Sequence, residues 1–330
     1  MFCSTIIATI GRASLSRAVH SVLSQTLPPG VAAEVIVVND SGRPLPPAEW
    51  QSAPNVRVLA TDRQERSVAR NAGAAAARGQ YLHFLDDDDW LLPGALAHFY
   101  AAAQNGAPGF IYGRTRMLDR DERLLFELSY ERTELVTPAL KPLVAFDGVM
   151  DGNCALPLMA GEFIALLGCC FRKDVFAATG GFHPEVSCGE DMDLCRHAAI
   201  YAEAVCLPVA VAEAGWGAAG STTVRTTGAQ QMFLARERIF AKPETYPRLL
   251  ASARAGRSSH WHGRLLRLYL SSLAWNVKRR RWGPALHRLV RALAAAGQTG
   301  AGWLQRPFWL GLRYPYLNGP YLRAFLQARW

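Results

Sequence analysis

Four consecutive aspartates, at positions 86–89, follow the apolar run YLHFL (81–85). Adjacent carboxylates repel one another unless a positive group neutralises them. A hard divalent cation such as Mg²⁺ or Mn²⁺ does so through oxygen ligands and keeps other positions for water and substrate phosphates. The alternative is a helix cap, because residues 89–92 could begin a helix with Pro93 in its first turn. The pattern predicts a metal-phosphate site, with Asp89 as the cap.

A second acidic group stands in the segment GEDMDLCRHA (189–198). Glu190, Asp191 and Asp193 lie at the start of a predicted helix whose apolar positions include Leu194 and Ala198. Acids in a first helical turn often only compensate the helix dipole, an effect of about 0.3 to 1 kcal/mol at an exposed site. A carboxylate here could instead take a proton from a substrate hydroxyl. The residues alone leave both interpretations open.

Alternating strand and helix signals surround these acids. Apolar runs typical of strands occur at 4–10, 33–40, 56–61 and 81–85, and helical spacing occurs at 14–26, 67–77 and 93–104. Continuous apolar strands between helices indicate a mostly parallel sheet covered on both faces. In such sheets, ligands bind outside the carboxyl ends of the strands. Asp40 and Asp86 follow two of these strands, so we expect the site at that edge.

Five motifs in order resemble the inverting family 2 glycosyltransferases of bacterial surface-polysaccharide type. The motifs are IIATIGR, VIVVND, ARNAG with ARGQYLHFLDDDDWLLPG, FRKDVFAATGGF and GEDMDLCRHA. The resemblance implies an α/β protein with the GT-A fold, which is Rossmann-like and has a mostly parallel sheet with flanking helices. It covers about the first 225 residues and leaves the rest of the chain to be interpreted separately.

The resemblance implies a role for each acid of the first group. The Asp-x-Asp motif of the family falls on Asp86, Asp87 and Asp88. Asp88 is the expected direct metal ligand, and Asp86 and Asp87 are expected to meet donor oxygens or metal-bound water. Thr9 and Asp40 match the nucleobase contacts of the family, and a carboxylate can accept a hydrogen bond from the N–H of a uracil-like base.

Further residues are carried over in the same way. Arg66, Arg70 and Asn71 lie in the segment that closes over the nucleotide in the family. The alternatives are a surface ion pair for Arg66 and loop ordering for Arg70 and Asn71. Residues 180–182 (GGF) are expected to shape a turn beside the acceptor site, since glycine allows backbone conformations closed to other residues.

The implied reaction is a single in-line displacement at the anomeric carbon with inversion. A nucleotide-diphosphate sugar, with a UDP-sugar favoured, is the donor, and a hydroxyl of a glycan or lipid-linked acceptor attacks it. Asp191 is the expected general base, with Glu190 as the alternate. Mn²⁺ or Mg²⁺ bridging the donor phosphates is the implied cofactor.

The chain departs from the family at three places, one of which is Asn39 with Asp40 where paired acids are commoner. An aromatic residue and Asn often follow the first-strand Thr, and Ile10 and Gly11 stand there instead. A His after an Arg is common further along, and Thr226 or Thr227 takes its place. A third protein ligand for the metal is therefore in doubt, and water or donor oxygens would complete the shell.

Two other functions fit part of the same pattern. A nucleotidyltransferase would also use strand-end aspartates and a divalent ion, but it would be expected to show a glycine-rich, basic phosphate loop. The segment ATIGRAS (8–14) is a weak version of such a loop. The other alternative is a catalytically inactive, membrane-docked protein that binds a glycan or a nucleotide.

The composition limits the class of protein. With 330 residues, 50% of them hydrophobic, the chain can bury a full core. Its seven cysteines include no CxxC pair, which argues against a disulfide framework or a zinc knuckle. No secretory signal is visible, and no apolar run reaches the roughly 18 residues of a membrane-spanning helix. We expect a cytoplasmic protein, or one held peripherally at the inner face of the cytoplasmic membrane. His20 and His83 lie on apolar elements and are expected to be buried or half-buried.

The composition changes near residue 240. Residues 245–330 contain fifteen Lys and Arg, no Asp or Glu, and six of the nine tryptophans. The segment AKPETYP (241–247) supplies two prolines at the boundary. The sequence therefore predicts a GT-A catalytic domain over 1–240 and a basic, aromatic-rich helical extension over 241–330.

The extension repeats apolar residues at helical spacing. These are Leu265, Leu266, Tyr269 and Leu273, followed by Leu286, Leu289, Val290 and Leu293. With clustered cations and Trp, such helices favour the interface of an anionic membrane. The alternatives are a helical lid packed on the acidic catalytic domain and a nucleic-acid surface, which basic charge alone does not establish. The expected partners are thus the nucleotide-sugar donor, the acceptor and an anionic membrane, with no nucleic acid.

Overall fold

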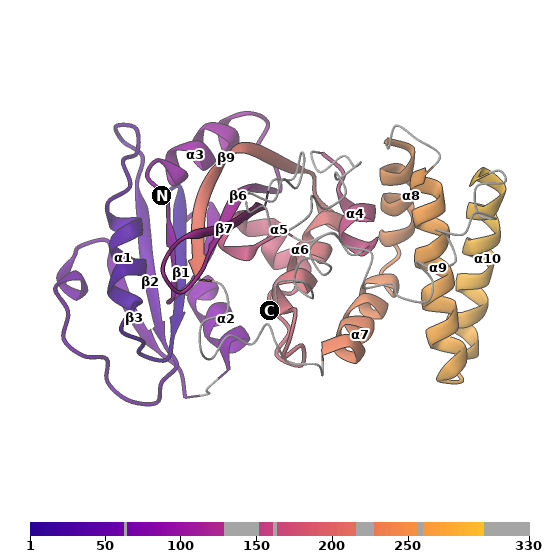
Figure 1. The fold of residues 1–330 in the computed structure, drawn as a ribbon, viewed down its shortest axis with the longest axis horizontal. Coiled ribbons are helices and arrows are strands. Elements are labelled where there is room, and N and C mark those ends of the chain that lie inside the picture. Colours follow the sequence, from indigo (N-terminus) through magenta and orange to yellow (C-terminus); the bar gives the residue numbers. More distant parts are fainter. Residues whose placement is uncertain (63–64, 129–151, 161–163, 216–227, 256–259, 300–330) are drawn as a thin grey trace.

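A computed structural model describes residues 1–62, 65–128, 152–160, 164–215, 228–255 and 260–299 (Figure 1). The strands are β1 Cys3–Thr9, β2 Ala33–Asn39, β3 Val56–Ala60, β4 Tyr81–Asp86, β5 Asp89–Leu91, β6 Phe110–Leu118, β7 Leu124–Leu128, β8 Cys169–Arg172 and β9 Ala204–Gly215. The α-helices are α1 Leu15–Leu23, α2 Arg66–Ala76, α3 Ala95–Gln104, α4 Ala155–Ala160, α5 Lys173–Thr179, α6 Glu190–Tyr201, α7 Gly228–Phe240, α8 Thr245–Ala255, α9 His260–Lys278 and α10 Trp282–Thr299.

These strands form one sheet in the order β3-β2-β1-β4-β8-β6-β9-β5, with β7 paired to β6. The first four strands in this order run parallel. Helices α1 and α2 pack against β1 and β2. Ile6, Ile7 and the run 35–38 are almost fully buried, as the continuous apolar runs predict for strands covered on both faces.

The strand register brings the expected site residues to one edge. Thr9 is the Cα partner of Asn39, and Ala8 is the partner of Asp86. The carboxyl ends of β1, β2 and β4 therefore meet, and Asp40 follows immediately after β2. This is the edge at which a parallel sheet binds ligands.

The expected helix cap at Asp89 is wrong. Asp89 begins the short strand β5, which pairs antiparallel with β9 through Asp89 and Ala214. Helix α3 starts at Ala95, and its N-cap is Gly94, which makes no side-chain capping bond. The ladder with β9 takes residues 89–91 away from the helix, so the fourth aspartate stays with the acidic group.

The two histidines expected to be buried differ. His83 is fully buried, and burial lowers the pKa of its ring to about 4 although a hydrogen bond to the Leu167 carbonyl opposes this. His20 is exposed on α1, so that prediction was wrong. All seven cysteines are free thiols, as expected.

The C-terminal helices α8, α9 and α10 lie together beyond α4 and α6, and α10 is the outermost element in Figure 1. Leu265, Leu266 and Tyr269 of α9 are buried, and α9 packs against α4, α8 and α10. Four apolar residues of α10, at 286, 289, 290 and 293, are instead exposed. Within the described residues, no helix combines the length and apolar character needed to cross a membrane.

Candidate active site

The acidic group at the end of β4 divides into two sets. Asp86, Asp88 and Asp89 each offer a carboxylate oxygen, and these oxygens lie within 4.8 Å of one another. All three residues are part-exposed. Asp87 points elsewhere and is 2% exposed. Although the four aspartates are adjacent in sequence, the turn places the carboxylate of Asp87 apart from the other three.

The carboxyl groups of Asp86, Asp88 and Asp89 are close enough to oppose one another's ionisation. Burial and the charge of Asp86 hold the pKa of Asp88 above its ordinary value, although Arg12 acts in the opposite direction. Burial and the charges of Asp86 and Asp88 raise the pKa of Asp89 well above its usual range. A raised pKa means that ionising the carboxyl costs free energy in this environment. Hard oxygen donors that repel one another suit Mg²⁺ or Mn²⁺, so the residues present fit the implied metal.

Asp87 braces the end of β4 against the end of β1. Its carboxylate accepts hydrogen bonds from the Thr9 hydroxyl at 2.5 Å and from Arg12 Nη1 at 2.5 Å. Arg12 also lies 3.2 Å from Asp88 Oδ2. Sequence reasoning missed Arg12; its only signal was a single cation placed three residues after the first strand. Both Asp87 oxygens are thus engaged within the protein.

Asp40 is buried beside Thr9. Its backbone N–H donates to the Thr9 carbonyl at 2.8 Å, and its Oδ1 accepts from the Thr61 hydroxyl at 2.5 Å. Thr61 lies just after β3 and was not foreseen, although it ends the strand run predicted over 56–61. These bonds hold the backbone of Asp40 and one of its carboxylate oxygens at the edge of the sheet.

Arg70 joins the first acidic group to the second. Its guanidinium is buried on α2, where Nη2 donates to Asp86 Oδ1 at 2.5 Å and Nη1 donates to Glu190 Oε1 at 2.9 Å. Arg66 Nε lies 2.7 Å from the same Glu190 oxygen. The two carboxylates raise the pKa of Arg70 despite its burial, so it stays charged. The Arg70 contact also lowers the pKa of Asp86, against the effect of burial.

Asp191 and Glu190 are placed differently at the start of α6. Glu190 is buried and paired with Arg66 and Arg70. Asp191 is half-buried, and its Oδ1 accepts from the Met192 N–H at 2.7 Å. No described cation forms an ion pair with Asp191. Burial raises the pKa of Asp191 above its ordinary value, which makes its carboxylate a stronger base.

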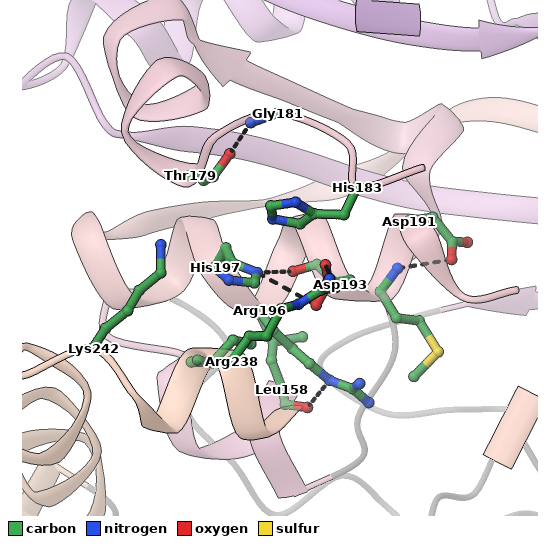
Figure 2. A network of polar contacts seen from close by, with 12 residues as sticks. Leu158, Thr179, Gly181, His183, Asp191, Asp193, Arg196, His197, Arg238 and Lys242 are labelled. Atoms are coloured by element: carbon green, nitrogen blue, oxygen red, sulfur yellow. Dashed lines mark hydrogen bonds and ion pairs between the residues drawn. The ribbon is translucent and has the colours of Figure 1, made fainter. Parts of the chain in front are cut away.

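A buried polar network holds α6 in place (Figure 2). Asp193 Oδ2 lies 3.3 Å from Arg238 Nη2 on α7, and His197 Nδ1 donates to the Asp193 carbonyl at 3.0 Å. Arg196 donates through Nε to the Leu158 carbonyl on α4 at 3.0 Å. Asp193, the third acid considered in this segment, therefore faces away from Asp191 and into the protein.

The GGF turn is tied to α2. Asn71 Nδ2 donates to the Phe182 carbonyl at 2.7 Å, and the Phe182 N–H donates to Asn71 Oδ1 at 2.9 Å. Gly181 has a φ of 75°, and a Cβ there would lie 2.7 Å from Asn71 Oδ1. Glycine is therefore required both for the backbone conformation and for the close approach. The position of Thr226 and Thr227 lies outside the described residues.

Comparisons with known proteins identify similar sequences and similar folds. Residues 4–143 match the model of Glycosyl transferase family 2. The resemblance to family 2 glycosyltransferases is confirmed. Over 86 residues the chain is 41% identical to the succinoglycan biosynthesis protein ExoO of Rhizobium meliloti (strain 1021). That match spans 25% of this chain and only 24% of ExoO.

Solved structures of S. aureus TarS share the fold. TarS 1–349 in complex with UDP-GlcNAc gives a TM-score of 0.59 at 15% identity, with 100% of this chain and 92% of that chain covered. A longer TarS structure gives 0.53 at 15% identity and covers 82% of this chain and 43% of TarS. At this identity the likeness concerns the fold, and the expected GT-A architecture with C-terminal helices is confirmed.

Proposed function

We propose that the protein is an inverting glycosyltransferase that moves a sugar from a nucleotide-diphosphate donor to a hydroxyl of a glycan or lipid-linked acceptor. One observation carries the proposal: the oxygens of Asp86, Asp88 and Asp89 gather at the carboxyl end of β4. Arg70 connects this group to the start of α6, where Asp191 lies. The contacts of Arg70 therefore connect the proposed diphosphate site to the helix that carries the proposed base.

The relatives support the choice of donor and acceptor class. A TarS structure holds UDP-GlcNAc, and ExoO acts in succinoglycan biosynthesis. A UDP-sugar donor and an acceptor of surface-polysaccharide type are therefore proposed for this chain. Asp40, which closes the edge of the sheet beside Thr9, would accept a hydrogen bond from the N–H of uracil.

The donor phosphates are proposed to lie over the first acidic group. Asp88 and Asp86, joined by Asp89, would hold Mn²⁺ or Mg²⁺, and the ion would neutralise the charge that develops on the departing diphosphate. Arg66 is part-exposed at the start of α2 and borders this space. Arg70 and Asn71 are proposed to order the donor wall through Asp86 and Phe182 rather than to bind by themselves.

Asp191 is proposed as the general base, with Glu190 as the alternate. The acceptor hydroxyl gives its proton to the Asp191 carboxylate as its oxygen bonds to the anomeric carbon. The bond from that carbon to the donor phosphate oxygen breaks, and its electron pair leaves with the diphosphate. Attack opposite the leaving group inverts the anomeric configuration. The pairing of Glu190 with two arginines supports Asp191 for this role.

The catalytic unit is proposed to comprise residues 1–240, and residues 241–330 the extension. The proposed division falls between α7, which ends at Phe240, and α8, which begins at Thr245. The extension is proposed to supply contact with an anionic membrane, which suits a lipid-linked acceptor.

The test is sugar transfer with a panel of nucleotide sugars in the presence of Mn²⁺, after thermal-shift screening has selected the donor. Asp191→Asn is expected to lower turnover about 10² to 10⁴-fold while nucleotide binding stays intact. Glu190→Gln is the companion variant that tests the alternate base. If no nucleotide sugar stabilises the protein and none is turned over, the proposed activity is wrong.

A further inference from the structure

Helix α10 carries a stripe of exposed apolar side chains. Trp282, Leu286, Leu289, Val290 and Leu293 are 64%, 63%, 39%, 55% and 65% exposed. At about 100° per residue, these five positions fall within an arc of about 100° on the helix surface. Half of the large apolar residues that are exposed in the described part of the chain therefore lie on one face of one helix.

A different face of α10 seats the helix on the protein. Ala285, Arg288, Ala292 and Ala295 are buried, and α10 packs against α9. Arg288 pairs with Glu237 of α7 at 3.3 Å. The anchoring contacts thus leave the apolar stripe turned outward, on the outermost helix of Figure 1.

Four consecutive cations adjoin the stripe. Residues 278–281, Lys-Arg-Arg-Arg, comprise the last residue of α9 and the turn to α10, and all four are exposed. Arg279 and Arg281 lie over the ring of Trp275 at 4.6 and 5.6 Å from its centroid. Trp282 begins the stripe directly after Arg281. An aromatic pair at residues 275 and 282 therefore flanks this basic corner.

We infer that the α10 stripe and the basic corner at 278–281 dock on an anionic lipid bilayer. An amphipathic helix lies in the membrane plane with its apolar face in the acyl boundary, and Trp is favoured at that depth. Cations beside it gain attraction from anionic headgroups within a Debye length of the surface. An anionic bilayer contacts both features, because its acyl chains can bury the apolar stripe and its headgroups can pair with the cations.

Other occupants of this face fit less well. A second copy docked through a two-fold axis would set two basic corners in one interface, where they would repel. Residues 300–330 contain four Arg and no acid, so that segment cannot neutralise the corner either. Nucleic acid would match the cations but would leave the leucines unused. Charge complementarity therefore favours lipid.

This inference deepens the proposed function, because a lipid-linked acceptor is reached at such a surface. Its test needs no donor and no turnover. The full chain is floated with vesicles of phosphatidylcholine, and with vesicles in which about one third of the lipid is phosphatidylglycerol. We expect binding to the anionic vesicles, much weaker binding to the neutral ones, and loss of binding as salt is raised.

Two sets of substitutions separate the contributions. Leu286→Ser with Leu293→Ser is expected to lower partitioning at least about tenfold. Arg279→Gln with Arg280→Gln is expected to lower it about twentyfold on anionic vesicles and little on neutral ones. The matched controls are Val58→Ser, an exposed apolar residue on β3, and Arg120→Gln, an exposed arginine in the β6–β7 turn. Neither control should change partitioning.

Three outcomes would overturn the inference. The wild-type chain could fail to float with anionic vesicles, or the double-leucine variant could float as well as the wild type. Light scattering could also show a dimer that the double-leucine variant loses, which would assign the face to a second copy. Donor binding by the same variants reports separately on the active site, so failure of one proposal does not hide failure of the other.

Discussion

The described part of the chain contains two clusters of three potential metal ligands, and their carboxyl groups have pKa values shifted in opposite directions. Asp86, Asp88 and Asp89 form one, and His183, Asp193 and His197 form the other, each with ligand atoms within 4.8 Å. The pKa values of Asp88 and Asp89 are raised, because burial and like charges oppose ionisation.

In the second cluster the balance is reversed. Burial would raise the pKa of Asp193, but His197 and Arg238 lower it below its ordinary value. The protein itself neutralises Asp193, whereas the first cluster keeps excess negative charge at an accessible edge. Two clusters with similar ligand spacing therefore differ in how far the protein neutralises their charge, and we expect a metal at the first rather than at the second.

The largest expected effect comes from Asp88→Asn. Removing one negative ligand from the cluster of Asp86, Asp88 and Asp89 should lower Mn²⁺-dependent transfer by roughly 10³-fold, because several kcal/mol of charge stabilisation are lost. Calorimetry of UDP binding with and without Mn²⁺ measures the metal dependence directly. Asp121→Asn, in an exposed turn, is the matched control. Unchanged metal dependence in Asp88→Asn would contradict the assignment.

Asp193→Asn should act on stability rather than on metal dependence. The substitution weakens the contacts to Arg238 and His197 in a buried setting, so we expect a loss of about 2 kcal/mol in the free energy of unfolding. Urea denaturation measures it. Asp174→Asn, which breaks the exposed pair with Arg172, should cost no more than about 0.5 kcal/mol. If Asp193→Asn also removes Mn²⁺ dependence, the two clusters are not distinct.

Asp89→Asn should have the opposite sign. Without metal at neutral pH, removing a carboxylate that is costly to ionise should stabilise the fold by about 1 kcal/mol. Added Mn²⁺ should then raise the melting temperature of the wild type more than that of the variant. Thermal unfolding with and without Mn²⁺ provides the measurement, and a destabilised Asp89→Asn protein would refute the charge argument.

The smallest effect is the pH dependence of these differences. The folded pKa of Asp193 is lowered, so its stabilising contribution is present above the unfolded value of about 4 and is lost as pH falls through the folded pKa. The folded pKa of Asp89 is raised, so its penalty is complete above that value, shrinks as pH falls below it and vanishes near the unfolded value of about 4. Wild type and Asp89→Asn should therefore converge in stability at a higher pH than wild type and Asp193→Asn. Melting temperatures across an acid pH series test the order.

Local pattern predicted much of the fold. The runs at 33–40 and 81–85 became β2 and β4 because both faces of a parallel strand are buried, and that burial is visible as continuous apolar sequence. The place of Asp89 could not be predicted, since β5 has three residues and its partner β9 lies far along the chain. Arg12 and Thr61 were missed for a similar reason, because their partners are set by the strand register.

In the C-terminal helices, too, the sequence pattern left part of the structure unpredicted. Apolar residues recur at helical spacing in both α9 and α10, yet those at 265, 266 and 269 are buried and those at 286, 290 and 293 are exposed. Periodicity identifies an apolar face but carries no information about what covers it. The sequence treated the extension as one unit, whereas α9 and α10 differ in whether their apolar faces are covered.

The Arg70 guanidinium would couple the proposed metal site to the position of the proposed base. It bonds Asp86 and Glu190 at once, so a cation drawn to Asp86 competes with Arg70 for that oxygen. A weaker bond to Asp86 would leave Arg70 with its contact to Glu190, at the helix end beside Asp191. Such coupling is reciprocal: if cation binding changes the stability of the contacts at the start of α6, those contacts change the binding free energy of the cation by the same amount. In such an enzyme, binding of the metal and donor would alter the contacts beside Asp191 before the acceptor binds.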